Sequence, residues 1–108
     1  MLITDKRLEQ ALTKIALSDA TVAELHAGVE RAESYAKAAK DAVFLRSEGS
    51  VADRQAIAGT HEDYALAMES YFVALQAYEK LRNERQREYL IADLWRSMSS
   101  ARTKGVVI

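Results

Sequence analysis

Arginine and lysine side chains that could bind phosphate are concentrated after position 79. Residues 80–108, which begin with "KLRNERQREYL", carry seven basic and three acidic side chains, whereas residues 1–79 carry eight basic and thirteen acidic ones. Cationic side chains along one helix contact nucleic-acid phosphates without reading base sequence, and salt weakens such binding. The phosphate-binding residues predicted on this basis are Lys80, Arg82, Arg85, Arg87, Arg96, Arg102 and Lys104.

A second interpretation of the same basic run is an ordinary solvated helix face. In that case Glu84 and Glu88 pair with arginines three or four residues away on the same helix. Arg82 and Arg85 share a helix face, and Arg85 comes near the predicted helix–helix seam. The sequence leaves both interpretations open.

Three tyrosines spaced by seven residues, Tyr64, Tyr71 and Tyr78, form the most conspicuous aromatic pattern. Aromatic rows of this kind stack on bases in proteins that bind single strands. The same spacing is typical of residues that line a seam between helices, with the hydroxyl groups at its edge. We interpret the row as part of the seam.

The two histidines do not form a recognisable metal site. His26 has Glu30 one turn later and His61 is followed by "EDY", but carboxylate–histidine metal sites need Glu-x-x-His pairs on two helices. No serine, cysteine or threonine stands in a motif with a histidine, and the glycines at 28, 49, 59 and 105 form no phosphate-binding loop. We therefore expect no enzyme activity, no metal, no other cofactor and no small-molecule substrate.

Composition predicts an all-α chain. The 108 residues include no proline, are 49% apolar and 29% charged, and are rich in the strong helix formers alanine, leucine, glutamate, arginine and lysine. The length predicts a single helical domain over residues 1–108. Because cysteine is absent and neither a signal peptide nor a run of ~20 apolar residues occurs, we expect a soluble protein of the cytoplasm that contacts no membrane.

The first half of the chain carries a heptad seam of five repeats, which predicts one long helix over about 5–47. Its two rows are Leu8, Ile15, Val22, Val29, Ala36 and Val43, and Ala11, Ser18, Leu25, Ala32 and Ala39. "SDAT" (18–21) offers an alternative start for a new helix, with Thr21 and Glu24 as a capping box. We favour continuity, since the seam keeps its phase through Ser18.

The second half predicts another long helix, over about 50–101, that folds back on the first. Glu48 and Gly49 form the turn, Gly49 supplies a left-handed C-cap, and Ser50 with Asp53 begins the next helix. The seam of this helix is Ile57, His61, Tyr64, Met68, Tyr71, Leu75 and Tyr78. Beyond Tyr78 the phase slips, because Leu81, Ala92 and Trp95 follow a shifted frame. Gly105 comes just past the end.

The predicted fold is thus a long antiparallel two-helix hairpin resembling a coiled coil. Residues whose numbers add to about 98 lie opposite each other, so the second helix extends past the first by about a dozen residues. A hairpin of two helices buries little core, and the predicted extension carries large apolar side chains. We therefore expect a homo-oligomer, with a dimer favoured, whose interface includes Leu94, Trp95 and Met98.

The stretches "AKDAVFLRSEGSVADRQA" and "YEKLRNERQREYLIADLWRS" resemble small helical proteins encoded by temperate phages and prophages near genes for recombination and single-strand DNA metabolism. The resemblance covers about residues 36–104 and brings no catalytic motif. It implies a setting, the cytoplasm of a bacterial host near phage DNA-handling machinery. Together with the basic C-terminal arm, this setting favours a non-enzymatic accessory protein of DNA recombination or replication, acting through the arm on DNA or through a DNA-metabolism protein. The alternative is an inhibitor or modulator of a host protein without nucleic-acid contact, and a purely structural assembly component is a third class that the sequence leaves open.

Overall fold

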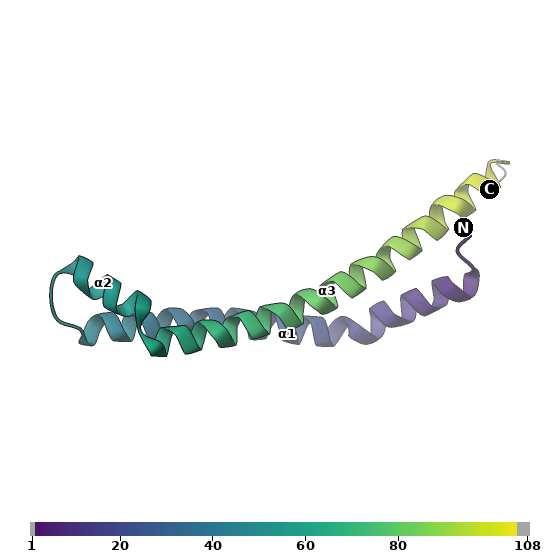
Figure 1. Cartoon of the computed structure of the whole chain (residues 1–108). Coiled ribbons are helices and arrows are strands. Elements are labelled where there is room, and N and C mark those ends of the chain that lie inside the picture. Colours follow the sequence, from purple (N-terminus) through teal and green to yellow (C-terminus); the bar gives the residue numbers. More distant parts are fainter. Residues whose placement is uncertain (1, 106–108) are drawn as a thin grey trace. The chain divides into compact units, whose positions relative to one another are not determined.

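The fold consists of two long helices packed against each other and a short helix that connects them (Figure 1). The computed structural model describes residues 2–105, in which α1 spans Asp5–Arg46, α2 spans Val51–Thr60 and α3 spans Glu62–Thr103. The prediction of an all-α helical hairpin is confirmed. None of the described helices is long and apolar enough to cross a membrane.

The contacts within the chain fall into two units, and α1 and α3 contribute to both. Unit 1 combines residues 1–22 with residues 80–108, so it holds the start of α1 and the second half of α3. Unit 2 is formed by residues 23–79 and holds the rest of α1, all of α2 and the first part of α3. In each unit the segments of α1 and α3 are antiparallel neighbours.

The heptad seam predicted for α1 is the face that the helix buries. Ala11, Val29, Ala36 and Val43 are buried, and the other seam positions are half-buried. Alanine at many of these positions lets the backbone of the facing helix come close. Val43 is the largest side chain that is fully buried among the described residues, so the core is thin.

Helix α1 continues through the "SDAT" segment, as predicted. The Ser18 hydroxyl donates a hydrogen bond to the Lys14 carbonyl oxygen at 2.7 Å, one turn back in the same helix. A serine that bonds to its own helix in this way does not cap a new one. The alternative break at Thr21 is wrong, because α1 is continuous from Asp5 to Arg46.

The seam predicted for α3 is confirmed from His61 to Tyr78, where every predicted position is half-buried. The phase slip is confirmed as well, since Ala92 is buried whereas Tyr89, in the unshifted frame, is exposed. Ile57 was placed in this seam incorrectly. It lies on α2, where Ala58 is the buried residue and Ile57 is exposed.

The predicted turn and the predicted start of the next helix are confirmed, but α1 ends at Arg46, so Gly49 lies in the turn three residues later and does not cap the helix. Gly49 has φ +114°, a conformation that side chains with a Cβ rarely adopt. The Ser50 hydroxyl accepts a hydrogen bond from the Asp53 backbone N–H, and the Asp53 carboxylate accepts one from the Ser50 N–H. Arg54 of α2 donates from Nε to the Phe44 carbonyl oxygen and covers the Phe44 ring, which attaches α2 to the end of α1.

A single helix over 50–101 is the one element that was predicted incorrectly. The chain leaves the helical conformation at His61 (φ −70°, ψ 144°), which separates α2 from α3. Gly59 weakens the helix just before this point, because glycine is a poor helix former. His61 Nδ1 then accepts a hydrogen bond from the Asp63 backbone N–H at 3.0 Å, so the imidazole caps α3 as serine or aspartate would.

Alanine substitutions at two glycines test the turn. Gly49→Ala should lower the free energy of unfolding by about 1–2 kcal/mol, because of its positive φ and because the new Cβ would meet Asp53 Cβ and Oδ2 at 3.2 Å. Gly59→Ala should raise it by about 0.5–1 kcal/mol, since α2 is helical there and no atom lies within 4 Å. Denaturant titration measures both, and effects of the same sign would contradict the assigned turn.

A substitution pair on α1 tests the seam. Val29→Asp puts a carboxylate without a partner into a buried position and should lower the free energy of unfolding by about 3 kcal/mol or more. Glu33→Ala, one turn later on the exposed side, should change it by less than about 0.5 kcal/mol. Thermal melts followed by circular dichroism make the comparison, and equal destabilisation would refute the frame.

Candidate functional site

The two units carry opposite net charges. Unit 1 has ten basic and six acidic side chains, a balance of +4, whereas unit 2 has five basic and ten acidic ones, a balance of −5. The chain as a whole has a formal charge of −1, so the segregation does not show in the total. An anionic partner is therefore attracted to unit 1 and repelled by unit 2.

Most of the predicted phosphate-binding residues lie on the surface of unit 1. Arg96 is near Asp93, one turn back, at 3.6 Å. The exposed members of the set are Lys80, Arg82, Arg87, Arg96, Arg102 and Lys104. These side chains are accessible to a ligand in solution, and we call them the basic surface of unit 1.

Arg85 differs from the other predicted residues because its guanidinium is used within the unit. It donates through Nη1 to the Ile15 carbonyl oxygen and to the Ser18 hydroxyl, each at 2.7 Å, and its Nη2 lies 3.3 Å from the Asp19 carboxylate. Its side chain is 12% exposed. The sequence correctly placed Arg85 at the seam, and its contacts assign it to holding α3 against α1.

Glu88 is a buried acid at the centre of unit 1. Its carboxylate accepts hydrogen bonds from Arg7 Nη2 at 2.8 and 3.0 Å and from Lys14 Nζ at 3.3 Å. Burial alone would raise the pKa of the Glu88 carboxyl, but the hydrogen bonds and positive charges of Arg7 and Lys14 outweigh burial and hold it below the ordinary value. We call Arg7, Lys14, Arg85 and Glu88 the polar clamp.

The polar clamp corrects one sequence interpretation. Glu88 was expected to pair with arginines on its own helix, yet its partners lie 81 and 74 residues away on α1. The signal that could have revealed this is its position, since Glu88 follows Arg85 by three residues in the shifted frame of α3. Because Glu88 is neutralised inside the unit, it does not cancel the charge of the arginines on the basic surface.

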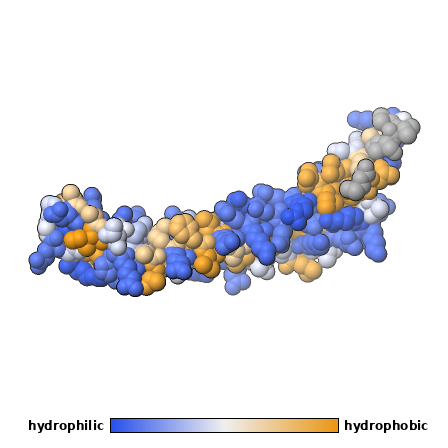
Figure 2. All heavy atoms as spheres, viewed as in Figure 1, coloured by the Kyte–Doolittle hydropathy of each residue, from blue (hydrophilic) through white to orange (hydrophobic). Residues whose placement is uncertain are grey.

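The residues predicted as an oligomer interface are only partly exposed. Trp95 does not lie beyond the first helix as predicted, because its Nε1 donates to Asp5 Oδ1 at 2.9 Å, at the first residue of α1. Ile3, just before α1, is buried as well. Trp95 and Met98 are half-buried, and Leu94 is exposed. The extension of α3 past α1 is thus shorter than a dozen residues, and Figure 2 shows apolar residues gathered toward its C-terminal end.

The tyrosines and histidines take structural positions. Tyr64, Tyr71 and Tyr78 are all half-buried, and Lys40 lies 5.2 Å from the centre of the Tyr64 ring. His26 packs on Tyr78 with ring centroids 5.1 Å apart. Among the described residues no three histidine, aspartate or glutamate side chains converge as metal ligands would.

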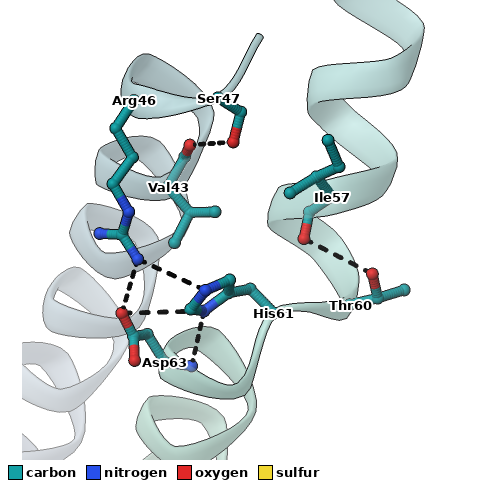
Figure 3. A network of polar contacts seen from close by, with 7 residues as sticks. All are labelled: Val43, Arg46, Ser47, Ile57, Thr60, His61 and Asp63. Carbon is teal, nitrogen blue, oxygen red and sulfur yellow. Dashed lines mark hydrogen bonds and ion pairs between the residues drawn. The ribbon is translucent and has the colours of Figure 1, made fainter.

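His61 belongs to a small network where α3 begins (Figure 3). Arg46 Nη2, from the last turn of α1, donates to Asp63 Oδ2 at 2.9 Å and lies 3.4 Å from His61 Nε2. The hydrogen bond from Arg46 holds the pKa of the Asp63 carboxyl below its ordinary value. The network fixes the start of α3 against the end of α1 and explains how the chain tolerates a break there.

Comparison with known proteins found no match to the chain among protein-family models, curated proteins or solved structures.

Replacing Glu88 tests the polar clamp. Glu88→Gln should lower the free energy of unfolding by about 1.5–3 kcal/mol, because Arg7 and Lys14 lose a charged acceptor. Glu84→Gln, one turn away and exposed, is the matched control and should have little effect.

The pH dependence of stability provides a second measurement on the same residue. Because the pKa of Glu88 is lowered in the folded state, its contribution is complete above the ordinary value of 4.5 and is lost as the pH falls below it. The native chain should therefore lose more stability below pH 4.5 than Glu88→Gln does. Parallel curves for the two proteins would contradict the assignment.

Proposed function

We propose that this chain is a non-enzymatic helical interaction protein of phage or prophage DNA metabolism, in which the basic surface of unit 1 contacts nucleic-acid phosphates. The observation that carries the proposal is the segregation of charge, +4 in unit 1 against −5 in unit 2. The expected setting is the cytoplasm of a bacterial host, where the chain serves recombination or replication as an accessory.

The polar clamp supports this proposal in a specific way. Within it, Glu88, one of the three acids of residues 80–108, is bound by Arg7 and Lys14 of α1. The arginines and lysines of the basic surface stay exposed on α3. Cations on a rigid helix contact successive phosphates with little loss of backbone entropy, and the contact is independent of base sequence.

Exposed apolar side chains favour a protein partner as part of the same function. They occur in both units and include Leu17, Leu66, Phe72, Val73 and Leu90. A pair of helices cannot bury all the apolar side chains that it carries. A chain that acts alone rarely exposes so many of them, so a partner that covers them is expected. If nucleic acid is not bound, the same surfaces support the alternative, an inhibitor or modulator of a host protein.

Charge-removal variants test nucleic-acid binding. The double variant Arg87→Gln/Lys104→Gln should weaken binding of a labelled single-stranded oligonucleotide and of a duplex, measured by fluorescence anisotropy. The slope of log K against log salt should become shallower by roughly two units, since about one counterion is released per phosphate contact.

The matched control removes the same charge from unit 2. Arg31→Gln/Lys37→Gln takes two exposed cations from the acidic unit and should leave the affinity and the salt slope nearly unchanged. Equal effects of the two double variants, or no binding by the native chain at 50 mM salt, would exclude the basic surface and promote the alternative.

A further inference from the structure

An open groove in unit 1 lies between α1 and α3, and its two walls come from the same level of the pair. The α1 wall belongs to residues 14–21 and the α3 wall to residues 81–88. Lys14 contacts Glu88 across the groove and Ser18 contacts Arg85, so the two stretches face each other directly. The groove has a volume of about 500 Å³, which falls in the range of sites that hold small organic ligands.

One end of the groove carries an excess of positive charge. Lys14 of α1 is 64% exposed, and Arg87 of α3 is exposed and makes no ion pair among the described residues. Glu88 lies between them, but it is already bound by Arg7 at 2.8 Å as well as by Lys14 at 3.3 Å. Three cations thus surround one buried acid, and Lys14 and Arg87 remain accessible to an anion from solution.

The rest of the groove has apolar walls. Leu17, one turn after Lys14, is 78% exposed, more than any other large apolar side chain among the described residues. Leu81 lines the opposite wall and is half-buried. No part of unit 1 covers these two leucines, so the groove presents an uncovered apolar surface one helical turn away from a positive one.

We propose that this groove binds one unpaired nucleotide of a nucleic-acid strand, with its phosphate on Lys14 and Arg87 and its base against Leu17 and Leu81. A nucleotide joins an anion to an apolar base face, which matches the two parts of the groove, and bases that leave a stack are held between aromatic or apolar side chains. The inference rests on the proposed function. It adds Lys14 and Leu17, both on α1, to the residues that contact nucleic acid.

Glu84 determines which part of the nucleotide lies at which end. Its exposed carboxylate stands in the α3 wall between Leu81 and Arg87 and repels phosphate, which leaves the Lys14 end to the phosphate. Carboxylates accept hydrogen bonds from the amino groups of bases, so Glu84 is compatible with a base beside it. A segment of an acidic protein has carboxylates on both sides of its apolar residues and would meet Glu84. The charge at a single end of the groove therefore fits a nucleotide better.

A base must be unpaired to enter the groove. In a duplex the bases are stacked and paired inside the helix, and only the phosphates and the groove edges face a protein. A duplex therefore contacts the cations of unit 1 without reaching Leu17. A single strand contacts the same cations and in addition places a base on the leucines, as single strands do on the apolar and aromatic surfaces of other proteins.

Two oligonucleotides with the same number of phosphates test the binding of a base. One is a single strand with ordinary bases, and the other is an abasic strand of equal length. The native chain should bind the strand with bases about fivefold or more tightly, measured by fluorescence anisotropy at 50 mM salt, since stacking of one base contributes a factor of about this size or larger.

Two leucines of α1 provide matched variants. Leu17→Ser should weaken binding of the strand with bases about fivefold and leave the abasic strand and a duplex unchanged. Leu12→Ser changes another exposed leucine of unit 1, about 140° away round the helix and outside the groove, and should alter no affinity by more than about twofold. Both leucines are exposed, so both variants should keep their helical circular dichroism.

Removal of the charge of Lys14 separates the phosphate contact from the base contact. Lys14→Gln should weaken the strand with bases and the abasic strand by the same factor, and the slope of log K against log salt should become shallower by roughly 0.7 for each. Lys6→Gln, on an exposed residue of α1 outside the groove, is the control and should have the smaller effect. Because both strands are compared on one protein, a change in its stability does not alter their ratio.

The outcomes separate this inference from the proposed function. Equal affinity of the native chain for the strand with bases and the abasic strand overturns the groove site, as do equal effects of Leu17→Ser and Leu12→Ser, and both results leave phosphate binding by the basic surface intact. A native chain that binds neither strand at 50 mM salt refutes the proposed function and the groove site together. Binding of a polyglutamate peptide in their place, weakened by Leu17→Ser, would assign the groove to an acidic protein segment.

Discussion

A pair of helices has a single shared seam, and this constraint decides most of what the chain does with its residues. Each helix can bury only the stripe that faces its neighbour, and here most of the apolar residues that are buried are alanines, so the core is thin. Val43 is the largest side chain fully buried within the described chain. Apolar residues outside the stripe, such as Leu17, Leu45 and Val73, are left in contact with solvent.

Polar contacts compensate for the thin core in each unit. In unit 1 the polar clamp joins α1 to α3 through the buried Glu88 and the half-buried Arg85, which bind residues at least 66 positions away. In unit 2 Arg46 and Asp63 join the end of α1 to the start of α3, and Arg54 attaches α2 to Phe44. Hydrogen bonds to charged groups stabilise a fold more than neutral ones do. They also specify which residues face each other, which an alanine seam does poorly.

The sequence predicts those parts of the structure that depend on periodicity and on local backbone conformation. Heptad spacing identified the buried face of α1, and Gly49 with Ser50 and Asp53 identified the turn, because both signals lie within a few neighbouring residues. The break at His61 was missed because histidine is not among the usual capping residues, although its bond to the Asp63 N–H is local. The partners of Glu88 and the contact of Trp95 with Asp5 were missed because those partners lie on α1, at least 74 positions away in the sequence. Composition alone does not say which of several arginines a buried acid will meet.

The formal charge of −1 does not show the segregation of charge between the two units, which bears most on the partners of this chain. Unit 1, with a balance of +4, attracts anionic molecules, and unit 2, with −5, attracts cationic ones. Salt weakens the attraction between opposite charges and also weakens the repulsion between like charges. The acidic unit exposes apolar residues on all three helices, among them Leu45, Ile57 and Val73, which favours a protein partner. The basic unit exposes Lys80, Arg87 and Lys104 and holds its one buried acid inward, which suits a polyanion.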